Sequence, residues 1–357
     1  MAPNESLRLD ALRFPLIVLV VFIHAYEASV RFSGSVVGAA EIDSGFDSLR
    51  VLISQCIARV AVPLFFLIAG YLFAWQDSFS WNRFVEKLRS RVRTLFIPFV
   101  FWNLLALALL LVVQTGAYFR GFDSGAQVRV SELGPGDLFL WFFGVTKAPF
   151  AYQFWFIRDL MVLVLIFPVI RLLLGSSVVG WISIACLGII WGGYVFETAL
   201  PTIEALFFFS LGVFVRIRGA TLFDLDRFGW VFLVLFLALL VPDMLIGGAP
   251  QKHVLHRLTV LLGVASFLFV TSIHSLNGFW VRMRTLSASA FFVFAAHEPL
   301  LTVVRKIYYK LVGPGAPHEV FLGYLFCPAF VILSLVAIHR ISKSAFPRAL
   351  NIVVGAR

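Results

Sequence analysis

The chain has 357 residues, of which 61% are hydrophobic and only 13% are charged, and its mean hydropathy is +0.95. This composition excludes a water-soluble globular domain, in which about 25% of residues are charged. The formal net charge of +10 would suggest nucleic-acid binding in a soluble protein, but the basic residues lie mostly in short segments between long apolar runs. Membrane topology explains the charge better, so we expect a lipid environment and no nucleic-acid partner.

Ten apolar stretches are long enough to cross ~30 Å of hydrocarbon as helices. They lie near residues 12–29, 50–75, 95–115, 154–174, 177–196, 200–216, 227–246, 255–273, 286–306 and 320–340. We therefore predict an all-α, polytopic integral membrane protein with about ten transmembrane helices. Because the polar breaks are short, residues 1–357 are expected to form a single transmembrane domain.

The positive-inside rule orients these spans. With an even number of spans, both termini and every second connection lie on one side. That side carries most of the Lys and Arg residues, including the group Arg83, Lys87, Arg89, Arg91 and Arg93. We therefore predict that both termini and this basic segment are cytoplasmic. The longest polar break, near 116–153, contains the short apolar piece 138–145, which is either an interfacial or re-entrant helix or an ordinary amphipathic loop.

The first apolar stretch carries two ionisable residues on one face. Arg13 and His24 are eleven positions apart, which on a helix is three turns plus ~20°, so both side chains point the same way. With Arg13 at the cytoplasmic interface, His24 lies about 16 Å deeper, near the bilayer midplane. An imidazole at that depth is costly unless it has a polar cavity or a partner. Glu27 is the nearest candidate partner in sequence, and a structural His bonded to a neighbouring helix is the alternative.

Four motifs in this order resemble the bacterial acyltransferase-3 family of integral membrane proteins. They are Leu9–Arg13 followed by His24, Val62–Tyr71, the basic Lys87–Arg93 before Ile97 and Pro98, and Phe154–Leu160. The resemblance runs from about residue 7 to 340. Members of this family, which includes sugar and polysaccharide O-acetyltransferases, move an acyl group, usually acetyl from acetyl-CoA, onto a hydroxyl of a carbohydrate. The resemblance implies a bacterial inner-membrane enzyme of exopolysaccharide type with a glycan or lipid-linked sugar acceptor. Any esterase-like partner outside the cytoplasm would be a separate protein.

The chemistry of acyl transfer assigns roles to these residues. A base must take the hydroxyl proton, or a nucleophile must hold the acyl group, and the near-neutral imidazole of His24 suits either role. We predict that His24 is catalytic and that Arg13 steers or neutralises the donor. The phosphates of acetyl-CoA suit the guanidinium groups of Arg89, Arg91 and Arg93 in a basic cytoplasmic loop. The alternative is that this loop serves topology alone.

Further polar residues are candidates for the acceptor site. Arg158 and Asp159 lie at the edge of the fourth span, and because adjacent residues do not face one another on a helix, we expect separate partners rather than a mutual salt bridge. Tyr152 and Trp155 are expected either to stack on a sugar ring or to belong to an interfacial aromatic belt.

His297 and Glu298, just before Pro299, are either a second polar cluster facing His24 or the support of a helix kink. Neither this pair nor any other group has the spacing of a metal site, so we expect no metal. The sequence thus favours a membrane O-acetyltransferase. The rival is a secondary transporter or exporter of a sugar or small anion, which predicts internal symmetry and broken helices that the sequence does not show.

Overall fold

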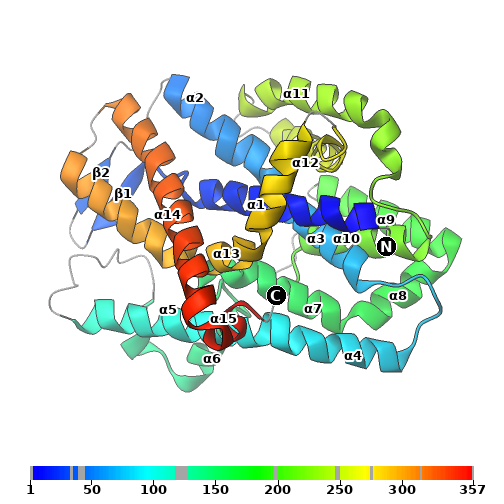
Figure 1. Cartoon of the computed structure of the whole chain (residues 1–357), viewed down its shortest axis with the longest axis horizontal. Helices are drawn as coiled ribbons and strands as arrows, with labels where there is room; N and C mark the ends of the chain where they lie inside the picture. Colours follow the sequence, from blue (N-terminus) through cyan, green and yellow to red (C-terminus); the bar gives the residue numbers. More distant parts are fainter. Residues whose placement is uncertain are drawn as a thin grey trace. The chain divides into compact units, whose positions relative to one another are not determined.

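The computed structural model of the chain describes residues 3–32, 35–38, 45–116, 128–193, 195, 200–245, 250–273, 276–313 and 316–355. Within these ranges the regular structure is helical apart from one antiparallel hairpin (Figure 1). The all-α fold class is therefore confirmed.

Each of the ten predicted apolar stretches overlaps a helix in the described part of the chain. The α-helices are α1 (Pro3–His24), α2 (Gly45–Val51), α3 (Ala61–Phe73), α4 (Trp81–Arg91), α5 (Ile97–Thr115), α6 (Pro135–Phe143), α7 (Trp155–Leu165), α8 (Phe167–Gly175), α9 (Ser177–Gly192), α10 (Ile203–Ile217), α11 (Gly229–Leu245), α12 (Pro250–Val270), α13 (Asn277–Val312), α14 (Pro317–Ala345) and α15 (Pro347–Val354). The hairpin pairs β1 (Ser29–Phe32) with β2 (Ser35–Gly38), with Val30 opposite Val37.

Several helices have the length and composition of membrane spans. In the described part of the chain, five qualify: Gly45–Phe73, Trp81–Thr115, Asp224–Leu245, Asn277–Val312 and Pro317–Ala345. The pair α8 and α9 adds a sixth if it is one span, although it bends by 120° at its junction. These helices bear out a polytopic membrane protein, whereas the count of about ten spans stays a prediction.

Two segments differ from the sequence-based expectation. The stretch near 154–174 is two helices, because Pro168 at the start of α8 has no N–H to continue the ladder of α7. The basic segment Lys87–Arg93 is not a loop: it is the end of α4, which joins α5 through the π-helical turn Val92–Phe96. The short apolar piece at 138–145 does form a helix, α6, while residues 117–127 before it lie outside the described residues.

The chain divides into two compact units. The first comprises Met1–Val20, Gln55–Val92 and Phe156–Ala290, and the second comprises Val21–Ser54, Arg93–Trp155 and Phe291–Arg357. In the first unit, α3 and α10 pack backbone to backbone. A Cβ on Gly70 would lie 2.0 Å from the Phe209 carbonyl oxygen, and a Cβ on Gly212 would lie 2.1 Å from that of Leu67. Small residues at such positions let membrane helices approach closely.

In the second unit, buried polar side chains link the helices. Ser54 Oγ donates to the Phe22 carbonyl at 2.7 Å and also bonds the Tyr324 hydroxyl at 2.8 Å. Asn103, which is fully buried in α5, accepts a hydrogen bond of 3.0 Å from the Ala151 backbone N–H. This bond fixes the start of the short 3₁₀ turn Tyr152–Phe154 against α5.

The glycine contact of α3 and α10 yields a stability test. Gly212→Ala should destabilise the first unit by about 1–3 kcal/mol, because the new methyl meets backbone that has no rotamer to escape into. The matched control is Gly192→Ala in α9, where nothing lies within 4 Å of the added Cβ. Thermal unfolding in detergent measures both, and equal unfolding temperatures for the two variants would contradict the close packing.

Candidate functional site

His24, the last residue of α1, lies in a polar cluster of the second unit. Its Nδ1 is 3.0 Å from the hydroxyl of Tyr152, and that hydroxyl donates to Glu298 Oε1 at 3.2 Å. The second carboxylate oxygen of Glu298 accepts from Thr302 Oγ1 at 2.8 Å. The ring of His297 packs against His24, with 5.1 Å between centroids. The structure therefore brings together four of the residues singled out from sequence: His24, Tyr152, His297 and Glu298.

With Glu298 ionised, the hydrogen bonds of this chain select one tautomer of His24. Tyr152 has one hydroxyl proton, which it donates to Glu298, so it must accept from His24 Nδ1–H. Tyr152 lies outside the candidate membrane spans, and burial, reinforced by the charge of Glu298, raises the pKa of its phenol. The phenol thus stays protonated at neutral pH and donates. With Nδ1 carrying the proton, the basic lone pair of His24 is on Nε2.

A break in α13 places His297 and Glu298. Glu298 has non-helical angles (φ −104°, ψ 133°) directly before Pro299, so the helical hydrogen bonds stop there. Gln153 Nε2 donates to the carbonyls of Ala295 at 3.1 Å and Glu298 at 3.3 Å. His297 is fully buried, its Nδ1 bonds the Phe294 carbonyl at 2.6 Å, and its Nε2 has no hydrogen-bond partner within the described structure.

Three other residues predicted from the sequence lie outside the cluster around His24. α1 ends at His24, so Glu27 is beyond the helix and exposed, and the bond shown for His24 is to Tyr152 instead. Trp155 begins α7 and is half-buried. Arg13 and His24 both lie on α1, but Arg13 belongs to the first unit. There it pairs with Asp10 at 3.1 Å.

The expectation of separate partners for Arg158 and Asp159 was wrong. Arg158 Nη2 lies 2.7 Å from Asp159 Oδ1 in a buried salt bridge of the first unit. The long arginine side chain folds back over its neighbour, which short side chains on adjacent helix positions do not do. Asp159 Oδ2 also accepts the backbone N–H of Thr202 at 2.8 Å, so the pair anchors the entry to α10.

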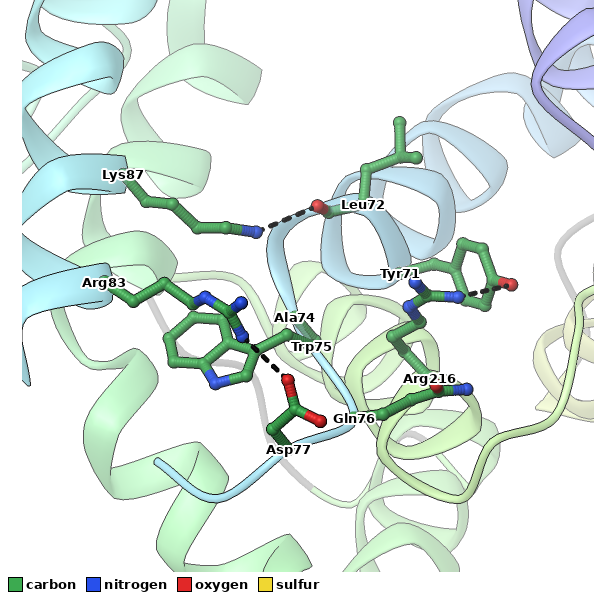
Figure 2. A pocket seen from close by; sticks show the side chains of 9 residues that line it. All are labelled: Tyr71, Leu72, Ala74, Trp75, Gln76, Asp77, Arg83, Lys87 and Arg216. Carbon is green, nitrogen blue, oxygen red and sulfur yellow. Dashed lines mark hydrogen bonds and ion pairs between the residues drawn. The ribbon is translucent and has the colours of Figure 1, made fainter. Parts of the chain in front are cut away.

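A basic pocket of about 390 Å³ lies in the first unit, at the end of α3. Figure 2 shows Arg83 and Lys87 reaching in from α4, Arg216 from α10, and the backbone from Leu72 to Asp77 passing between them. Arg83 pairs with Asp77 at 3.2 Å, and Lys87 Nζ donates to the Phe73 carbonyl at 2.5 Å and, more weakly, to that of Leu72. Trp75 and Tyr71 supply aromatic walls.

The pocket holds more positive than negative charge. Lys87 has unfavourable charge interactions with Arg83, Arg91 and Arg216. Arg91 itself is half-buried 5.7 Å over the ring of Phe73 and feels the charge of Arg13. A bound anion would relieve this repulsion.

The three arginines predicted to bind the donor therefore differ. Arg91 follows Lys87 by four residues, on the face of α4 that borders the pocket, whereas Arg89 and Arg93 are exposed.

Sequence reasoning missed Gln153, Arg216, Tyr71 and Trp75. Gln153 gave no signal, because nothing in the sequence says that a buried amide will meet a helix break far along the chain. Arg216 follows an apolar stretch like many other basic residues of the chain, and only the packing of α10 on α3 brings it to Tyr71, with Nη1 3.4 Å from the hydroxyl.

Comparisons with known proteins give matches that cover nearly the whole chain. A family model described as an acyltransferase domain matches residues 6–339. The succinoglycan biosynthesis protein ExoH of Rhizobium meliloti is 24% identical over 373 residues, covering 100% of this chain and 94% of that protein. No solved structure matches the chain significantly.

The helix break supplies a further stability test. Gln153→Leu keeps the side-chain volume but leaves the buried carbonyls of Ala295 and Glu298 without their donor, at a cost of about 1–3 kcal/mol. Gln55→Leu is the matched control, because the Gln55 side chain accepts hydrogen bonds from the exposed Arg59. Thermal unfolding in detergent should show a clear loss for Gln153→Leu and little for the control. Equal losses would mean that Gln153 does not cap the break.

Proposed function

The chain belongs to the acyltransferase-3 family, and we propose that it is a membrane O-acyltransferase moving an acetyl group from cytosolic acetyl-CoA to a hydroxyl of a glycan or lipid-linked sugar. The family match supports acyl transfer, and the likeness to a succinoglycan biosynthesis protein supports a polysaccharide acceptor. We place the enzyme in the bacterial inner membrane with both termini cytoplasmic, because that orientation gathers most Lys and Arg on one side.

The observation that carries the catalytic part of the proposal is the hydrogen-bonded chain from His24 through Tyr152 to Glu298. A basic nitrogen held in one tautomer by a hydroxyl, which is itself held by a carboxylate, has the logic of a base with an orienting group. His24 Nε2 takes the proton of the acceptor hydroxyl as its oxygen attacks the thioester carbonyl carbon. The carbon–sulfur bond then breaks, and the imidazolium returns the proton to the leaving thiolate. Glu298 stabilises the transient positive charge of His24 through Tyr152.

The same lone pair would serve if His24 held the acyl group itself. In that alternative, Nε2 attacks the thioester carbonyl carbon, the carbon–sulfur bond breaks and the CoA thiolate leaves. The acceptor oxygen then attacks the acyl-imidazolium, the carbon–nitrogen bond breaks, and the hydroxyl proton passes through the freed Nε2 to the thiolate. Both routes require Nδ1 to keep its proton, which the bond to Tyr152 arranges.

We assign the donor's nucleotide to the basic pocket of the first unit. Arg83, Lys87 and Arg216 suit phosphate oxygens, and Trp75 suits a purine ring. Arg91 adds a fourth cation at the border, while the exposed Arg89 and Arg93 attract the donor at longer range. Arg13, whose charge acts on Arg91, belongs to the same basic surface.

One structural feature is also expected of a secondary transporter. Broken helices are present in α13 and between α8 and α9, contrary to the sequence-based expectation. They do not favour transport over catalysis, because a helix break also delivers His297 and Glu298 to His24. The family match favours the acyltransferase.

The proposed role of His24 as the base can be tested by substitution. His24→Ala should lower acetyl transfer by about 10²- to 10⁴-fold while acetyl-CoA still binds. His24→Gln should fail as well, because an amide cannot take the proton. Tyr152→Phe should lower kcat with little change in the KM for the donor. The control is His318→Gln, an exposed histidine of the same unit. Transfer by purified protein in liposomes is the measurement, and a near wild-type rate for His24→Ala would move the search to His297 and Glu298.

The donor site can be tested separately. Arg91→Gln and Arg216→Gln should each raise the KM for acetyl-CoA roughly ten- to a hundred-fold, the equivalent of about 1.5–3 kcal/mol for a lost charge-assisted contact. Arg89→Gln and Arg93→Gln should have smaller effects, since both side chains are exposed. Arg282→Gln, on an exposed face of α13, is the control. If donor dependence is unchanged in all of them, the basic segment serves topology alone.

A further inference from the structure

A second pocket, of about 380 Å³, lies in the second unit and has no role in the reaction described above. It is formed by β1, the residues before it and the half of α13 that follows the break, and Figure 1 shows the hairpin beside this half. The lining residues that matter are Glu27, Arg31, Thr302, Arg305 and Lys306.

The walls of this pocket are fixed to each other. Arg305 Nη2 donates to the backbone carbonyls of Glu27 and Ser29, and the Tyr309 hydroxyl donates to the Ala28 carbonyl at 2.9 Å. Gly38, at φ +107°, lies so close that a Cβ there would be 2.5 Å from the Ala28 oxygen. The hairpin is therefore held against α13, and the pocket is a preformed feature rather than a gap between separate segments.

The pocket carries an excess of positive charge. The lining includes three cations, Arg31, Arg305 and Lys306, and one carboxylate, Glu27, so the formal charge of these lining residues is two units positive. Lys306 is only 3% exposed, with its amino group 5.6 Å from the ring of Phe32. Burying a cation in a membrane protein is costly, so its presence indicates a use. Guanidinium and ammonium groups converging on one pocket suit a carboxylate or a phosphate.

The pocket is linked directly to the catalytic cluster. Thr302, which lines it, donates to the Glu298 oxygen at 2.8 Å, and Glu298 is the group that holds Tyr152 against His24. Thr302 follows Glu298 by four residues, and Arg305 and Lys306 follow Thr302 by three and four, so the four residues lie along one side of α13. Arg305 and Lys306 lie about 10–12 Å along the helix from Glu298, which is comparable to the length of a disaccharide.

We propose that this pocket is an acceptor subsite, which binds an anionic group, a carboxylate or a phosphate, carried by the glycan whose hydroxyl reacts at His24. The inference rests on the proposed acyl transfer and narrows the acceptor to an acidic glycan, with the anionic group one or two sugar residues from the acylated hydroxyl. A neutral acceptor would leave Arg31, Arg305 and Lys306 without a partner from the substrate.

Binding can be measured without any reaction. Full-length protein in lipid nanodiscs is titrated calorimetrically with three probes: glucose, glucuronate and glucose 1-phosphate. The two anionic sugars should bind at least about ten-fold more tightly than glucose, as expected for one charge-assisted contact. Tighter binding of glucuronate would identify the anionic group of the acceptor as a carboxylate, and tighter binding of glucose 1-phosphate would identify it as a phosphate. Equal affinities for these two anionic sugars would show that the pocket recognises charge alone.

Two charge-reversed variants locate the site. Arg31→Glu, on an exposed strand position, should abolish the preference for anionic sugars, and Arg31→Gln should weaken it. Lys310→Glu is the matched control, because Lys310 is exposed on α13 and does not line the pocket. Thermal unfolding checks that each variant is folded. The proposal is overturned if glucose binds as tightly as the anionic sugars, or if Arg31→Glu keeps the preference.

A transfer assay separates this proposal from the proposed function. Wild-type protein supplied with acetyl-CoA should acetylate a disaccharide that ends in glucuronate or glucose 1-phosphate at a higher kcat/KM than the matching neutral disaccharide, and Arg31→Glu should bring that ratio close to one. Equal kcat/KM for neutral and anionic acceptors would overturn the acceptor role while acyl transfer stands. Transfer to none of these disaccharides by wild-type protein, with anionic sugars still bound through Arg31, would contradict acyl transfer to sugars and leave an anion-binding pocket of another purpose.

Discussion

The helix break at Glu298 is the constraint on which the proposed catalytic arrangement depends. In the hydrocarbon region of a bilayer, backbone polar groups must be paired inside the protein, so a span that stops its own hydrogen-bond ladder needs donors from elsewhere. Gln153 supplies them to the carbonyls of Ala295 and Glu298. Its neighbour Tyr152 is thereby carried to Glu298 and His24, so pairing the broken helix also assembles the hydrogen-bonded chain.

That arrangement relies on a second buried amide. Asn103 of α5 holds the backbone of Ala151, one residue before the turn that carries Tyr152 and Gln153. Asn103 and Gln153 together set where the phenol of Tyr152 points. Such contacts are specific, because an alternative packing would leave the Asn103 oxygen and the Gln153 nitrogen unpaired at a cost of about 1–3 kcal/mol each.

The two basic pockets, one in each unit, are built in the same way. In each, a cation is tied to backbone carbonyls: Lys87 to the end of α3, and Arg305 to the residues before β1. Each tied cation stands among others of the same sign, an arrangement that is unfavourable until an anion enters. An enzyme that joins a phosphorylated donor to an acidic acceptor needs two such pockets, whereas a membrane scaffold without chemistry needs neither.

The sequence by itself determined the membrane class, the all-α fold, the family resemblance and the candidates His24, Tyr152, His297 and Glu298. It could do so because hydropathy is a local property, and because an ionisable residue inside an apolar run is costly wherever the chain folds.

Only the tertiary structure decided which of these residues meet. Four features were not predicted from the sequence. They are the salt bridge of Arg158 with Asp159, the helix formed by the basic segment, the capping of the break by Gln153 and the pocket beside β1. Each depends on a side-chain conformation, or on contact between segments far apart in the chain, neither of which the periodicity of one segment encodes.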